Sequence, residues 1–142
     1  MTEKRRAIIL TFAGTLPFLL GAFFLWLDFF PTFLPASIKH IVHSYAVVIT
    51  SFICGIHWGI HLQVPGRLPL FIISVVIALV MWASLLVMGT ASGLFITLLG
   101  FFVLWLLDFR ILALKMIPPW YFGLRTIAST IVIFCLLVLI LQ

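Results

Sequence analysis

The sequence predicts an all-α membrane protein, built as a single bundle of five transmembrane helices. Two observations carry this prediction. Of the 142 residues, 65% are hydrophobic and 8% are charged, which leaves too few polar side chains to cover the surface of a water-soluble domain. The apolar residues also fall into five stretches, each close to the length of about 20 residues that a helix needs to cross a bilayer.

The bounds of the elements follow from these apolar lengths and from the helix breakers between them. In chain order, we expect helices near Ala7–Leu27, Ile41–Leu62, Leu68–Met88, Gly93–Ile111 and Tyr121–Leu141. Proline or glycine interrupts each connection, at Pro31 and Pro35, at Pro65, Gly66 and Pro69, from Gly89 to Gly93, and at Pro118 and Pro119. Because every connection is short, residues 1–142 are expected to form one domain of antiparallel helices.

Pro17 lies inside the first predicted helix. Proline lacks the backbone N–H of a regular helix and its ring crowds the preceding turn, so we expect a kink at this point. The run is too long for a cleaved signal peptide and has no small-residue cleavage site, so we interpret it as a retained membrane helix.

Basic residues gather at one end of the predicted helices. The positive-inside rule assigns that end to the cytoplasm, which gives a cytoplasmic N-terminus and an outside C-terminus. The basic residues on this side are Lys4, Arg5, Arg6, Arg67, Arg110, Lys115 and Arg125, against Lys39 on the other side. They form no extended run, so we expect membrane lipid as a partner and no nucleic acid.

Several classes of enzyme lack their sequence signals. The chain has no Gly-rich phosphate loop, no Ser/His/Asp arrangement and no Cys-x-x-Cys pair, so a conventional hydrolase or kinase has no support. Cys54 and Cys135 both lie inside apolar segments, which favours reduced cysteines that serve packing. The sequence therefore favours a protein that is not an enzyme.

Three short polar strings of residues interrupt the otherwise apolar sequence. They are the Gly55-Ile56-His57-Trp58-Gly59 string that ends the run from Ser44, the region of Asp108, and Pro119-Trp120-Tyr121 followed by Leu124-Arg125. Together they resemble the family of transmembrane protein 69, also described as domain of unknown function 3429. The resemblance implies a multi-pass protein of the bacterial inner membrane, or of the mitochondrial inner membrane in a eukaryote, and it implies no activity. Cys54 departs from the small residue that this family tends to carry there.

The predicted topology brings the three strings to the cytoplasmic leaflet. Polar groups at this depth are costly, so they indicate a candidate site. Asp108 and Arg125 fall at similar depth on consecutive helices, and we expect them to form an ion pair. The pair could serve structure alone, or Arg125 could also bind an anionic headgroup or substrate. The candidate ligand-binding residues are His57, Trp58, Asp108, Trp120, Tyr121 and Arg125.

The second predicted helix has two distinct faces. Ser51, Gly55 and Gly59 recur every four residues and form a small-residue stripe that would let another helix, in this chain or in a partner, approach closely. A polar stripe lies on roughly the opposite face and should point into the bundle, where His57 and Thr50 could bond to other helices. The polar stripe consists of His57 together with His43, Thr50, Cys54 and His61.

Four histidines raise the question of a metal or haem. His57 and His61 could share an ion at i and i+4, but a third ligand would have to come from elsewhere. His43 and His57 have a spacing that suits two stacked haems, but a facing helix offers no matching histidines, so haem would need a dimer. We therefore expect no cofactor and no metal.

Three functions remain open at this stage. The leading hypothesis is a membrane protein whose polar cluster binds a lipid headgroup, quinone or small amphipathic anion, or docks a membrane partner. A small proton-linked transporter or channel would use His57, Asp108 and Arg125 as its polar path. A lipid-modifying membrane enzyme comes third. The Ser51/Gly55/Gly59 face could also support a homo-oligomer.

Overall fold

The computed structural model describes residues 2–27, 37–65 and 68–142. These residues form helices and their connections, with no strand among them, and five helical stretches are long and apolar enough to span a membrane. The predicted all-α fold with five membrane helices is therefore confirmed. The helices are α1 (Glu3–Ala13), α2 (Leu16–Trp26), α3 (Ile38–Gln63), α4 (Leu70–Ser84), the short η1 (Leu85–Val87), α5 (Ala91–Ala113) and α6 (Pro119–Leu141).

The observed helix ends differ from the predicted ones by up to four residues. The largest difference is at the start, where α1 begins at Glu3 and the prediction began at Ala7. This additional first turn lies beyond the apolar run and includes an exposed ion pair between Glu3 and Arg6. Ser37 and Thr90 accept hydrogen bonds from backbone N–H groups of the first turns of α3 and α5, which explains why these helices begin slightly before their apolar stretches.

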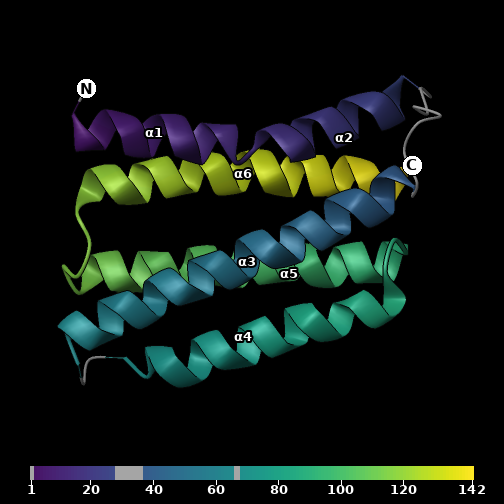
Figure 1. Ribbon diagram of the computed structural model, residues 1–142. Helices are drawn as coiled ribbons and strands as arrows, with labels where there is room; N and C mark the ends of the chain where they lie inside the picture. Colours follow the sequence, from purple (N-terminus) through teal and green to yellow (C-terminus); the bar gives the residue numbers. More distant parts are fainter. Residues whose placement is uncertain (1, 28–36, 66–67) are drawn as a thin grey trace.

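The helices lie side by side as a bundle (Figure 1). α1 and α2 together form the first membrane-spanning stretch and run along α6, while α3 crosses the bundle and packs against α2, α4 and α5. The two ends of the chain lie at opposite ends of the bundle. The end at which α1 begins and α5 terminates carries Lys4, Arg5, Arg6, Arg110 and Lys115. Arg67 lies outside the described residues, and which side of a membrane this basic end faces remains a prediction.

The expected kink at Pro17 is present as the break between α1 and α2. Pro17 occupies the first turn of α2, and the N–H of Phe18 bonds the carbonyl of Thr15 rather than that of Gly14. The freed Gly14 carbonyl accepts a hydrogen bond from the Tyr45 hydroxyl of α3 at 3.0 Å. The break is thus satisfied from a neighbouring helix, as buried backbone groups in a membrane must be.

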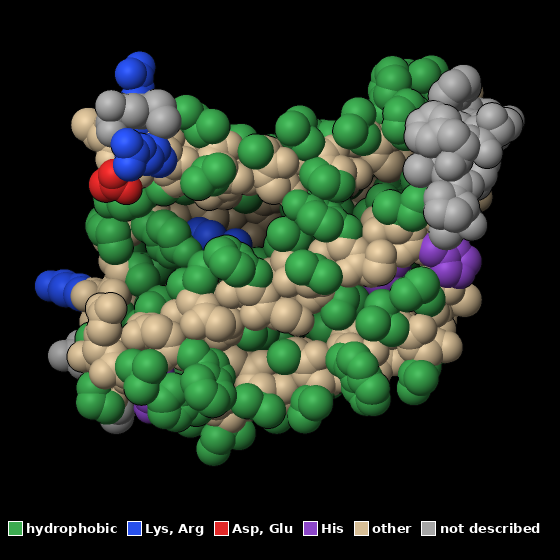
Figure 2. Space-filling model, viewed as in Figure 1, with side chains coloured by type: hydrophobic (Ala, Val, Ile, Leu, Met, Phe, Trp, Pro, Cys, Tyr) green, Lys and Arg blue, Asp and Glu red, His purple; other side chains and the backbone are tan. Residues whose placement is uncertain are grey.

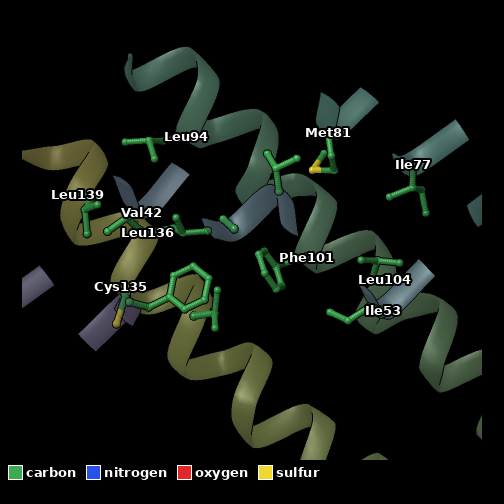
Figure 3. Close-up of a cluster of buried hydrophobic side chains, with 14 of the residues drawn as sticks. Val42, Ile53, Ile77, Met81, Leu94, Phe101, Leu104, Cys135, Leu136 and Leu139 are labelled. Carbon is green, nitrogen blue, oxygen red and sulfur yellow. The ribbon is translucent and has the colours of Figure 1, made fainter. Parts of the chain in front are cut away.

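A continuous apolar core fills the middle of the bundle (Figure 3). Its side chains come from all five membrane-spanning stretches, with Phe18 against Phe101 in an edge-to-face contact at 5.9 Å between ring centroids. The labelled members in the figure are Val42, Ile53, Ile77, Met81, Leu94, Phe101, Leu104, Cys135, Leu136 and Leu139. Cys54 and Cys135 are both buried and free, in agreement with their predicted packing role.

The close helix contacts use different glycines from those predicted. A Cβ atom added at Gly21 would collide with Val42, and one added at Gly93 would lie 2.5 Å from the carbonyl oxygen of Val87. At Gly55 and Gly59 an added Cβ meets no described atom within 4 Å. The small-residue stripe therefore packs against no described helix of this chain, because α3 turns this face outward. Its use by a partner or a second copy stays a prediction.

Candidate functional site

Three helices each contribute one residue to a buried charged cluster near the basic end of the bundle. His57 comes from α3, Asp108 from α5 and Arg125 from α6. The Nε2 atom of His57 lies 2.8 Å from Oδ1 of Asp108, and Nε of Arg125 donates to Oδ2 of Asp108 at 3.1 Å. We call these three residues the triad. Arg125 lies six residues into α6, about 9 Å along the helix axis from its start.

The triad is almost fully removed from solvent. His57 is 1%, Asp108 2% and Arg125 9% exposed. A carboxylate at this depth is tolerated only when it is paired. Both oxygens of Asp108 have partners. The expected ion pair between Asp108 and Arg125 is present, and His57 joins it through the second carboxylate oxygen.

Some polar atoms of this region have no protein partner among the described residues. Nη2 of Arg125, Nδ1 of His57 and the Ser129 hydroxyl are buried without a hydrogen bond. Unpaired buried donors are costly, roughly 1–3 kcal/mol each and more for charged groups. Because Asp108 already engages one side of the Arg125 guanidinium, Nη2 remains free to donate to a ligand.

Arg125 and Ser129 both line a cavity of about 140 Å³. The other lining residues come from α1 and α2, from α3, from Phe101 of α5 and from α6, and most are apolar. The kink supplies part of the wall, since Gly14, Thr15 and Phe18 all face it. Figure 2 shows a hollow in the same region, between the α1–α2 band and α3, with basic atoms on its floor. Among the described lining residues, Arg125 is the only one with a full charge.

The aromatic residues predicted for the site take different places. Tyr121 lines the cavity. Trp120 lies at the basic end of the bundle, half-exposed, with Nζ of Lys4 5.4 Å from its ring centroid. Trp58 is 44% exposed and packs on Phe71 of α4, with the ring centroids 4.7 Å apart. Trp58 is therefore not a neighbour of the cavity, because its position on α3 turns it to the α4 side.

The predicted polar stripe of α3 is occupied by structural contacts. His43 is fully buried, with Nε2 2.9 Å from the Ser84 hydroxyl and Nδ1 accepting from the N–H of Gly89. The Thr50 hydroxyl donates to carbonyls of its own helix, not to another helix as one interpretation had it. His61 packs against Phe71 in a tilted ring contact, with the ring centroids 4.1 Å apart. Among the described residues, no three His, Cys, Asp or Glu side chains are grouped to hold a metal ion.

Ser129 and Tyr45 were not anticipated. Ser129 follows Arg125 by four residues and so shares its helix face, a spacing that could have identified it. Tyr45 had no comparable signal, because its role depends on how α3 is turned relative to the break before Pro17. Ser84, the partner of His43, was also missed, because its role depends on how the end of α4 is turned toward α3.

The comparisons with other proteins identify a family and little else. A family model described as "Protein of unknown function (DUF3429)" matches residues 3–141. No curated protein and no solved structure matches the chain. The likeness to transmembrane protein 69 remains an expectation. The match covers the whole triad, both walls of the cavity and every described helix, and the chain belongs to the DUF3429 family.

Proposed function

We propose that this chain is a membrane protein that binds the anionic head of a single-chain amphiphile in the cavity beside Arg125. One observation carries the proposal, namely that Arg125 is the one fully charged residue among the described residues that line the cavity, and that Nη2 of its buried guanidinium has no partner among the described residues. Arginine has donors and no acceptor, so the missing partner is an oxygen that accepts hydrogen bonds. A carboxylate, sulfonate or phosphate oxygen supplies both the acceptor and a complementary charge.

Size and lining support one chain rather than a whole two-chain lipid. A cavity of about 140 Å³ is close to the one of about 150 Å³ that admits a single benzene molecule. It therefore accommodates a small head and the first part of a tail. Leu10, Phe52 and Val132 offer apolar contact for such a tail, and the unpaired Ser129 hydroxyl can donate to a second oxygen of the head.

A proton-linked transporter has less support. Transport needs polar groups that lead from one side of the bundle to the other. Two polar side chains of α3 that lie between the triad and the far end of the bundle are already bonded, Thr50 to its own helix and His43 to Ser84 and Gly89. A lipid-modifying enzyme has no separate observation in its favour.

The proposal includes a location and an orientation. We place the protein in a bacterial inner membrane, with the basic end of the bundle in the cytoplasm. A reporter fused after Gln142 should then be periplasmic, and one inserted at Pro65 should be cytoplasmic. The opposite pair of results would move the cavity to the other leaflet without changing its chemistry.

Binding can be tested with decanesulfonate, a single-chain anion, on the protein in zwitterionic lipid nanodiscs. Calorimetry should detect a saturable site on the intact protein, with decanol, which lacks the charge, binding far more weakly. Arg125→Gln should lower the affinity by at least about tenfold, since a charge-assisted hydrogen bond contributes roughly 1.5–3 kcal/mol. Arg110→Gln is the matched control, because it removes the same charge from an exposed position at the same end of the bundle.

A second variant distinguishes a specific loss of binding from a loss of folding. Ser129→Leu fills the cavity while leaving all three members of the triad in place, and it should abolish saturable binding. Equal binding by Arg125→Gln, Ser129→Leu and the intact protein would contradict the proposal. So would saturable binding of decanol with the affinity of decanesulfonate, which would point to a neutral ligand such as a quinone.

A further inference from the structure

Asp108 connects a residue that lines the cavity with a histidine that does not. One carboxylate oxygen holds Arg125, which lines the cavity, and the other holds Nε2 of His57, which does not. Two hydrogen-bond acceptors repel each other, so an ionised Asp108 requires Nε2 to carry the hydrogen. The neutral imidazole then keeps its lone pair on Nδ1, an atom without a partner among the described residues.

The charges of the site do not balance once an anion is present. The charges of Arg125 and Asp108 cancel each other, so the triad is neutral as long as no proton is added to His57. A bound anion therefore leaves a net charge of minus one in a region where all three members of the triad are nearly fully buried. An uncompensated charge in such surroundings is strongly disfavoured. One proton added to the triad would restore neutrality.

We propose that the site binds its anion together with one proton, which is taken up at Nδ1 of His57. The inference rests on the proposed function, since it describes how that same cavity accommodates a charge. The proton comes from water at the basic end of the bundle and returns there on release. The one bond formed is N–H, and the resulting imidazolium stays hydrogen-bonded to Asp108 through Nε2.

The ionisable groups on the packed helices leave His57 as the natural acceptor. Tyr121 of α6 is close enough to Asp108 and Arg125 to interact with their charges. Its phenol is already protonated near neutral pH and does not accept a second proton. α2 and α4 carry no ionisable side chain, and those of α1 are confined to its first turn. The other ionisable groups on the three triad helices are Lys39, His40, His43, Tyr45, Cys54 and His61 on α3, Arg110 on α5 and Cys135 on α6.

The experiment measures the affinity for decanesulfonate as a function of pH, from about pH 6 to about pH 8, the range in which histidine titrates. A sulfonate stays ionised throughout, so any pH dependence belongs to the protein. Where the free His57 is neutral, linkage to one proton weakens binding by about tenfold for each unit of rising pH. Calorimetry in two buffers of different ionisation enthalpy should count up to one proton taken up per bound anion.

Two glutamine variants assign the proton to its residue. His57→Gln keeps an N–H donor that can reach Asp108 but cannot take up the proton. It should therefore bind decanesulfonate more weakly than the intact protein does at low pH, and with the pH dependence lost. His61→Gln is the matched control, because His61 is one turn further along α3 and also has an unpartnered Nδ1; this variant should keep the full pH dependence.

The outcomes separate this inference from the function on which it rests. Saturable binding that is the same at every pH, or a pH dependence that survives in His57→Gln, would overturn the proton coupling and leave the binding site intact. No saturable binding of decanesulfonate at any pH would overturn both.

Discussion

Two buried histidines on the same helix have opposite surroundings. His43 and His57 lie fourteen residues apart on α3, and both are almost fully buried. His43 has a neutral partner on each ring nitrogen, the Ser84 hydroxyl and the Gly89 N–H. His57 has a carboxylate on one nitrogen and no partner among the described residues on the other.

The difference separates a structural contact from a candidate site. At His43 the Gly89 N–H donates to Nδ1, so Nε2 must carry the hydrogen and donate to Ser84. Ser84 in turn donates to the Met81 carbonyl, and every group is used. At the triad, a full charge and unpaired donors lie beside a cavity. A buried polar group whose hydrogen bonds are all made within the protein is accounted for by its contribution to stability. A buried polar group that lacks a hydrogen-bond partner is instead a candidate for binding a ligand.

The largest effect is expected at Asp108. Asp108→Asn removes the charge that compensates Arg125, and breaking a buried ion pair in this way costs about 3 kcal/mol or more. Reversible unfolding in mixed detergent micelles would measure the loss. The double variant Asp108→Asn with Arg125→Gln should be destabilised by less than the sum of the two single variants, because neither charge is then left alone.

Glu3→Gln is the control for Asp108, since Glu3 forms an exposed ion pair with Arg6. Exposed pairs contribute little to stability, so the unfolding free energy should barely change. Strictly additive effects of Asp108→Asn and Arg125→Gln would mean that the two residues are not energetic partners, and would remove the basis for treating the triad as a unit.

A smaller effect is expected at His43. His43→Leu keeps much of the side-chain volume but leaves the Gly89 N–H without its acceptor, at a cost of about 1–3 kcal/mol. The affinity for decanesulfonate should stay within about twofold of the intact protein, because His43 is not among the residues that line the cavity. A large loss of affinity in this variant would show that the two ends of α3 are not as separate as their contacts indicate.

The smallest effect is expected on the outward face of α3. Alanine in place of Gly55 meets no described atom, so Gly55→Ala should be neutral or stabilising by up to about 1 kcal/mol through helix propensity. Gly21→Ala should instead destabilise by about 1–3 kcal/mol, since its Cβ would collide with Val42. If the Ser51/Gly55/Gly59 face joins two copies, Gly55→Leu should shift the oligomeric state in native mass spectrometry while leaving decanesulfonate binding unchanged.

The fold could be predicted because its determinants are local. Apolar length sets each membrane helix, and Pro17 sets the break between α1 and α2 through its missing N–H. The Asp108–Arg125 pair could also be predicted, since two charges at one depth on consecutive antiparallel helices have strong reason to meet. In both cases the cost of an unsatisfied polar group in the bundle leaves few alternatives.

The rotation of each helix about its axis could not be predicted in the same way. Most helices here are apolar on every side, so hydropathy does not distinguish the face that meets lipid from the face that meets protein. That is why Trp58 was expected near the triad yet packs on Phe71, and why the Gly55 face was expected to receive a helix yet points outward. The spacing of four residues places Ser129 on the same face of α6 as Arg125, but the cavity that both residues line is defined only once α6 is placed against α1.

The central claim, that an anionic amphiphile occupies the cavity beside Arg125, is tested most directly by photo-crosslinking. A decanesulfonate with a diazirine in its chain should label buried lining residues such as Ile53, Ala128 and Val132 in the intact protein. The labelling should disappear in Ser129→Leu and compete with unlabelled decanesulfonate but not with decanol. Labels spread over outward-facing residues such as Leu86 and Phe134, unchanged by Ser129→Leu, would contradict the account.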